Sequence, residues 1–133
     1  MARVLIADDD TAFLDTLSQL LEQAGHYVEV ALDGQIALSR ATSSSFDALI
    51  ADIVMPNMDG LELIRTLHRQ MPDLIMIAVS SAGGEGRGQD YLPAAATFGA
   101  AATFSKRRII DLPETLDQLL AMRREPALIA RAG

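Results

Sequence analysis

The chain has 133 residues, half of them hydrophobic, with a formal net charge of −7 and no cysteine. This is the length of one domain, and its apolar content suffices for a core without disulfides. The negative charge argues against nucleic-acid binding by this domain alone, because such affinity rests on neutralised phosphates. No apolar stretch approaches the roughly 20 residues of a membrane span, and the acidic start is unlike a signal peptide. We therefore expect a soluble, cytoplasmic domain without membrane contact.

Short apolar runs alternate along the chain with segments of helical periodicity. Residues 4–7 predict a strand buried on both faces, and leucines at helical spacing predict a helix over 11–24, stopped by Gly25. Asp10 or Thr11 is expected to cap that helix. By the same criteria, further strands are expected over 26–31 (at a sheet edge), 48–51, 74–79 and 102–104, and further helices over 36–42, 61–71, 89–98 and 111–123.

Five strands alternating with five helices predict an α/β fold, a doubly wound five-stranded parallel sheet with helices on both faces. We assign residues 1–123 to this domain and 124–133 to a C-terminal tail, for which disorder is one interpretation. In such sheets, sites form beyond the carboxyl ends of the strands. Polar residues follow the predicted strands at that edge, namely Asp8, Asp9, Asp52, Ser80 and Lys106.

If the first and third strands lie side by side, Asp8, Asp9 and Asp52 share a pocket, and such a pocket implies a cation. Two unit charges about 4 Å apart repel by about 4 kcal/mol at an effective dielectric near 20, so three carboxylates in one pocket require protonation or a bound ion. An oxygen-only site suits Mg²⁺, which prefers to share its ligands with phosphate. A hydroxyl from Ser80 and an ammonium from Lys106 would bind the oxygens of a phosphoryl group. Asp52, followed by a tight turn, is the best-placed nucleophile.

These residues resemble the receiver domain of two-component response regulators, the CheY-like family. The resemblance runs from Arg3 to about Arg123 and is carried by VLIADDD (4–10), DALIADIVMPNMDGLELI (47–64), Ser80 and Lys106. It implies the flavodoxin-like (βα)5 fold and a switch that is not a turnover enzyme. By the resemblance, Asp52 accepts phosphate from the phosphohistidine of a histidine kinase or phosphotransfer protein.

The resemblance also implies roles for the other residues. Asp9, Asp52 and the backbone carbonyl of Val54 would hold Mg²⁺, and Asp8 would contribute through water. Ser80 would turn toward the phosphoryl group, and Lys106 would pair with it. The 89–123 face would bind a downstream protein or a second copy of the chain.

Three departures from the family pattern stand out. Arg107 follows Lys106 where the family has proline after a cis peptide, and we expect this peptide to be trans. Thr103 occupies the position of the usual switch aromatic, and Phe104 is expected in the core. Ser80 and Lys106 are 26 positions apart, about four more than in a compact receiver, and the glycine-rich loop 83–88 absorbs the excess as a mobile lid or a solvated insertion. This loop lacks the Lys-Ser/Thr of a P-loop, so nucleotide binding is not expected.

Two alternatives remain open. A haloacid-dehalogenase-like phosphatase would use Asp8 as its nucleophile, but Ala12 breaks that motif and the chain has no room for a cap domain. A degenerate receiver would bind protein partners without taking phosphate, as the missing proline and aromatic suggest. His26 and His68 lack partner motifs and are expected on the surface.

Overall fold

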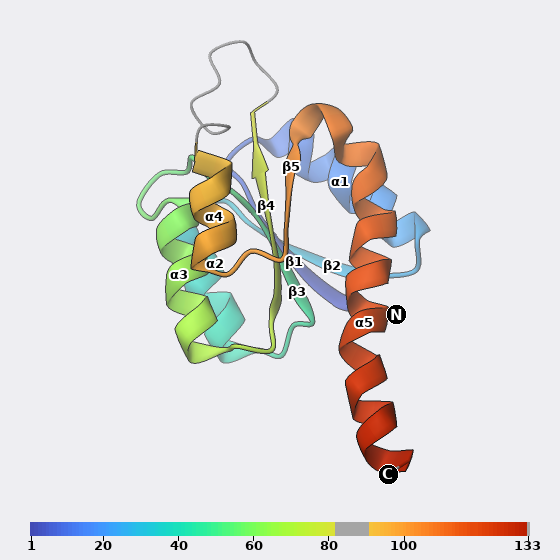
Figure 1. Cartoon of the computed structure of the whole chain (residues 1–133). Helices are drawn as coiled ribbons and strands as arrows, with labels where there is room; N and C mark the ends of the chain where they lie inside the picture. The colour runs from blue at the N-terminus through green and yellow to red at the C-terminus, as the bar shows by residue number, and fades with distance from the viewer. Residues whose placement is uncertain (82–90, 133) are drawn as a thin grey trace.

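The computed structural model describes residues 1–81 and 91–132, which contain one five-stranded sheet (Figure 1). Neighbouring strands are parallel and follow the order β2-β1-β3-β4-β5. The strands are β1 (Arg3–Ala7), β2 (Tyr27–Ala31), β3 (Ala48–Asp52), β4 (Ile75–Ser80) and β5 (Ala102–Ser105).

Helices connect successive strands. They are α1 (Thr11–Gln23), α2 (Gly34–Ser43), α3 (Gly60–Gln70), α4 (Leu92–Phe98) and α5 (Leu112–Ala132), with the 3₁₀ helix η2 (Lys106–Asp111) between β5 and α5. The predicted Asp10 cap is confirmed, since its Oδ1 accepts a hydrogen bond of 3.2 Å from the backbone N–H of Phe13.

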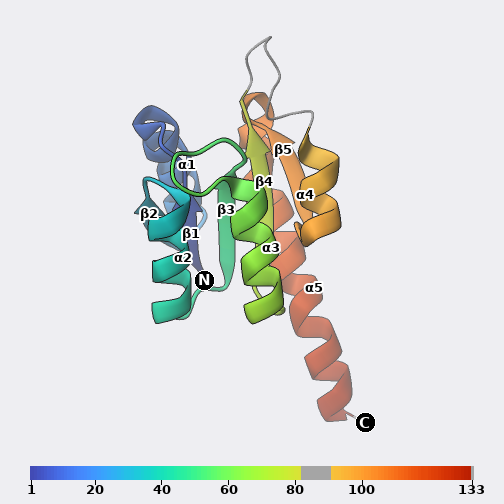
Figure 2. The ribbon, with the colours of Figure 1, turned by 90° about the vertical axis from the view of Figure 1, so that its left-hand side faces the viewer.

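The sheet lies between two helical layers, so the predicted doubly wound α/β fold is confirmed. In Figure 1, α1 and α5 cover one face and α2, α3 and α4 cover the other, and Figure 2 shows the latter three side by side. Each interface is a separate apolar cluster. Leu5 and Ala7 belong to the α2–α4 side, whereas Val4 and Ile6 belong to the α1–α5 side. The period-two alternation of a strand divides its apolar residues between the two clusters.

The central strands are the apolar runs of the sequence for this reason. Every residue of β3 and β4 is buried. Strand β2 lies at an edge of the sheet, as predicted, and most of its residues are accessible. The strand directions bring all five carboxyl ends to one edge of the sheet, and this edge positions the site.

Two predictions differ from the structure. Helix α5 continues to Ala132, past the expected end at Arg123, and its last turns extend beyond the sheet (Figure 1). Residues 124–132 are rich in alanine, leucine and arginine, which favour the continuation, although Pro126 within the segment opposes it. The expectation that His26 is on the surface is wrong. Its ring is buried, and both ring nitrogens have partners there: Nδ1 accepts from the Ala2 N–H (3.1 Å) and Nε2 lies 2.9 Å from Asp117 Oδ1 on α5. The glycine-rich loop 83–88 lies outside the described residues.

Candidate functional site

The strand order brings the predicted polar residues to one edge of the sheet. Ala7 pairs with Ala51, so Asp8 and Asp52 come next at matching positions of the neighbouring strands β1 and β3. Ser80 ends β4 opposite Ser105 of β5, and Lys106 follows directly. The β1–β3–β4–β5 adjacency therefore places a cluster of carboxylates beside a hydroxyl and an ammonium.

Three carboxylates form the acidic cluster, defined as Asp8, Asp9 and Asp52. Each offers one oxygen, and these oxygens lie within 4.8 Å of one another. Asp8 and Asp52 are buried, and Asp9 is exposed. Within the described residues, Oδ1 of Asp52 is buried without a hydrogen-bond partner. A buried anionic oxygen without a partner is costly, and a hard divalent cation with oxygen ligands would satisfy it. The cluster fits a magnesium ion.

Lys106 provides the positive charge of the site. Its Nζ lies 2.7 Å from Asp8 Oδ2 and 3.4 Å from Asp52 Oδ2, and only 12% of its side chain is exposed. The same nitrogen lies 4.3 Å from the centre of the Phe13 ring at the start of α1, close enough for a cation–π contact. The described residues contain no cis peptide bond, so the predicted trans peptide after Lys106 is confirmed. Lys106 reaches both buried carboxylates from that backbone.

Burial and mutual repulsion alter the acidities of these groups. Burial, with the negative charge of Asp8, raises the pKa of Asp52 to about 7, while Lys106 and the backbone N–H of Val54 act in the opposite direction. Burial also raises the pKa of Asp8. The pKa of Lys106 rises because its two anionic partners outweigh its own burial. The site has spare negative charge that a cation would stabilise.

The loop after Asp52 is held by close backbone packing. A Cβ on Gly60 would lie 2.2 Å from the carbonyl oxygen of Asp52, so α3 starts directly against the end of β3. Asn57 has a positive φ of 69° and donates a hydrogen bond of 2.9 Å from its side chain to Asp33 Oδ2. This packing explains the glycine and turn residues of the 53–60 segment. That the Val54 carbonyl binds the metal stays a prediction.

The β4–β5 side of the site is only partly as expected. Ser80 is fully buried, and its hydroxyl has no hydrogen-bond partner within the described residues, which suits a group that awaits a ligand. Thr103 is exposed on the edge strand β5 and lines a shallow hollow with Phe104 and residues of η2 and α5. It does not join the acidic cluster. Phe104 packs against the α1–α5 core cluster, as predicted.

Phe13 is the site residue that the sequence did not indicate. Its spacing in α1 marks it as one more apolar position of an amphipathic helix, and nothing local distinguishes it from Leu14 or Leu17. Its contact with Lys106 joins residues 93 positions apart, because the start of α1 lies near the end of β5 in space.

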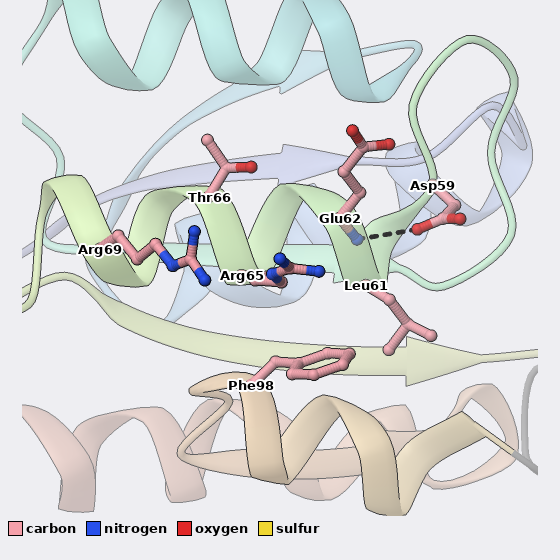
Figure 3. Close-up of a pocket in the computed structure, with 7 residues that line it drawn as sticks. All are labelled: Asp59, Leu61, Glu62, Arg65, Thr66, Arg69 and Phe98. Carbon is pink, nitrogen blue, oxygen red and sulfur yellow. Dashed lines mark hydrogen bonds between the residues drawn. The ribbon is translucent and has the colours of Figure 1, made fainter.

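Another hollow lies between α3 and α4 (Figure 3). Its volume is about 420 Å³. Four of its seven lining residues are charged, and Leu61 and Phe98 supply its apolar part. Ligand pockets are lined mainly by apolar groups around a few polar ones, so this hollow lacks their character. The acidic cluster is the stronger candidate site.

Among the described residues, no helix has the length and apolarity to cross a membrane.

Curated proteins that are similar in sequence to this chain include response regulators. Response regulator MprA of Mycobacterium avium (strain 104) is 39% identical over 99 residues, which are 68% of this chain and 43% of MprA. MprA of Mycobacterium tuberculosis (strain CDC 1551 / Oshkosh) gives the same identity and coverage. This chain thus spans less than half the length of the curated relatives it matches.

Solved structures of response regulators are also similar to this chain. A CheY-like receiver domain protein from Methanospirillum hungatei JF-1 superposes with a TM-score of 0.84 and 30% identity, covering 95% of this chain and 98% of that one. TrrA from Thermotoga maritima, solved in complex with Mg(2+)-BeF, gives a TM-score of 0.76 and 27% identity over 90% and 99% of the two chains. The family model described as the response regulator receiver domain matches residues 4–117. The chain therefore belongs to the response regulator receiver domain family of two-component systems.

Proposed function

We propose that this receiver domain accepts a phosphoryl group on Asp52 in a magnesium-dependent reaction and so operates as a switch. The observation that carries the proposal is the state of the Asp52 carboxylate. One of its oxygens is buried without a hydrogen-bond partner among the described residues, and the other lies 3.4 Å from Lys106. A nucleophile needs a free oxygen, and phosphoryl transfer needs positive charge beside it.

Each residue has a distinct task in this proposal. A carboxylate oxygen of Asp52 attacks the phosphorus, and the bond from phosphorus to the donor's histidine nitrogen breaks. The imidazole leaves with the electron pair of that bond and takes up a proton. Lys106, already beside Asp52, pairs with a phosphoryl oxygen, and the hydroxyl of Ser80 donates a hydrogen bond to another. Asp8, Asp9, Asp52 and the backbone carbonyl of Val54 would hold Mg²⁺, which supplies charge stabilisation for the phosphoryl oxygens.

Other proteins would recognise the change that phosphorylation of Asp52 produces in this domain. We propose a sensor histidine kinase or phosphotransfer protein as the phosphodonor, in the cytoplasm. A downstream protein or a second copy of the chain would bind through the 89–123 face, of which the structure describes residues 91–123. The protein acts stoichiometrically, because the phosphoryl group stays on Asp52 until water removes it. It is then a switch and not a turnover enzyme.

Two alternatives are less well supported. A phosphatase with Asp8 as nucleophile conflicts with the contacts of that carboxylate, since Oδ2 lies 2.7 Å from Lys106 and Oδ1 accepts from the Asp10 N–H. A degenerate receiver that no longer takes phosphate would not need a complete acidic cluster. The gathering of Asp8, Asp9 and Asp52 argues against it.

The test is phosphorylation by acetyl phosphate in the presence of Mg²⁺, followed by intact mass. Wild type should gain about 80 Da, the mass of one added HPO₃ unit. Asp52→Asn should gain nothing, and Asp15→Asn, an exposed change on α1, should behave as wild type. Chelation of the metal should stop the reaction. A gain on Asp52→Asn would contradict the assignment of Asp52, and a wild type that neither gains mass nor binds beryllofluoride would favour the degenerate receiver.

A further inference from the structure

The position of Lys106 is not fixed by its own backbone. It is the first residue of η2, directly after β5, and the next residue is Arg107 instead of a proline with a fixed φ. The nearest local restraint is the hydroxyl of Ser105, which accepts a hydrogen bond of 3.3 Å from the Arg107 N–H. A lysine side chain also has a flexible four-carbon stem. Contacts from residues distant in the sequence must therefore hold the Lys106 ammonium in place.

The Phe13 ring is in place to do so. Its centre lies 4.3 Å from Lys106 Nζ, while the same nitrogen contacts Asp8 Oδ2 at 2.7 Å. A cation within about 6 Å of a ring centroid is attracted by the ring face. The backbone of Phe13 is itself anchored, because its N–H donates to the Asp10 side chain. The ring is therefore attached to the segment that carries Asp8.

A hollow beside Lys106 shows what the ring prevents. It has a volume of about 410 Å³ and is lined by both Phe13 and Lys106, together with Asp10, Ala12, Thr16, Ser81 and Ile109. Without the ring face, the ammonium could turn into this hollow and be hydrated there. With it, the ammonium stays between the ring and the two buried carboxylates.

We propose that Phe13 is a positioning residue, whose ring face holds the Lys106 ammonium beside Asp52 ready for the incoming phosphoryl group. This rests on the proposed function of Asp52. In this proposal the ring acts on the reaction through its contact with Lys106. Its removal should therefore slow phosphoryl transfer while the affinity for Mg²⁺ alone is retained.

Two matched variants separate the ring face from mere bulk. Phe13→Leu removes the ring but keeps an apolar side chain, and Phe13→Tyr keeps the ring. We expect Phe13→Leu to lower the rate of labelling by acetyl phosphate at saturating Mg²⁺, and the affinity for beryllofluoride, by about three- to tenfold. Phe13→Tyr should stay within about twofold of wild type. Thermal unfolding checks that each variant folds, and Phe13→Met replaces Phe13→Leu if that variant does not.

A nuclear magnetic resonance measurement tests the contact without any phosphorylation. The ε-methylene protons of Lys106 should be shifted upfield by the ring in wild type and in Phe13→Tyr, and should return toward ordinary lysine values in Phe13→Leu. If neither the wild type nor any variant takes phosphate but these shifts behave as stated, the proposed function fails and the contact between Phe13 and Lys106 stands. Equal losses of rate in Phe13→Leu and Phe13→Tyr would overturn the positioning role, as would an unchanged rate or an unmoved Lys106 resonance in Phe13→Leu.

Discussion

The carboxyl edge of the sheet has two halves that are built differently. In the β1–β3 half, Asp8 follows β1 at the position that matches Asp52 at the end of the neighbouring β3, and backbone packing at Gly60 fixes the start of α3 against the end of β3. In the β4–β5 half, Lys106 reaches the same point through a long side chain held by the Phe13 ring and by its ion pairs. The acidic half depends on backbone register, whereas the cationic half depends on side-chain contacts.

This difference bears on where the family pattern can vary. The acidic half keeps the residues of the pattern, because Asp8 and Asp52 are placed by the register of β1 and β3, and a shift of one residue would move a side chain to the other face. The cationic half departs from the pattern at Thr103 and Arg107. Lys106 nevertheless lies beside both buried carboxylates, since a flexible side chain can reach one point from more than one backbone arrangement.

The largest expected effect comes from removing the charge that joins the halves. Without divalent cation at pH 8, Lys106→Met should lower the free energy of unfolding by about 3 kcal/mol, because the buried carboxylates lose their counter-charge. Urea unfolding measures this, and added Mg²⁺ should restore part of the loss. Arg107→Met, an exposed neighbour, should change stability by less than about 0.5 kcal/mol. Equal, small effects of both variants would mean that the halves are not coupled through Lys106.

The next effect is the dependence of stability on pH in the metal-free protein. The pKa of Asp52 is about 7 in the folded chain and near its ordinary 3.8 when unfolded, so between these values the folded state binds more protons. The free energy of unfolding should therefore fall as pH rises from about 4 to 7, by at most about 1.4 kcal/mol per pH unit from this group. Asp52→Asn should flatten the slope in this window and Asp15→Asn should not. An unchanged slope in Asp52→Asn would contradict the assignment of the shift.

The binding of Mg²⁺ tests the acidic half separately from the cationic half. At a concentration tenfold above its dissociation constant, the ion should raise the free energy of unfolding by about 1.4 kcal/mol, since it binds only the folded chain. Asp9→Ala should reduce this gain with little effect on the metal-free protein, because Asp9 is exposed and belongs to the acidic cluster. Thermal unfolding with and without Mg²⁺ checks both, with Asp15→Ala as the control. The same gain in Asp9→Ala and wild type would exclude Asp9 as a ligand.

The smallest effect separates two hydroxyls of the cationic half. Ser80→Ala should raise the free energy of unfolding by up to about 1 kcal/mol, because it removes a buried hydroxyl that has no partner among the described residues, and it should weaken beryllofluoride binding. Thr103→Ala, at an exposed position, should alter stability by less than about 0.5 kcal/mol. Destabilisation by Ser80→Ala would show that its hydroxyl is already bonded in the resting protein.

The sequence by itself determined the fold class and the acidic half of the site. Apolar runs with helices between them specify parallel strands, and the run of residues 47–64 identifies Asp52 through its neighbours in the chain. Both signals are local, so they can be found without knowing the tertiary structure.

Only the tertiary structure decided the contacts that cross between elements. The Phe13 ring under Lys106, the burial of His26 against Asp117 and the exposure of Thr103 each depend on which elements meet. A side chain's neighbours across such distances leave no mark on the residues beside it, because an apolar residue in a helix has the same local pattern whether it contacts a leucine or an ammonium. The charge of the site was present in the sequence, and its arrangement came from the packing of helices on the sheet.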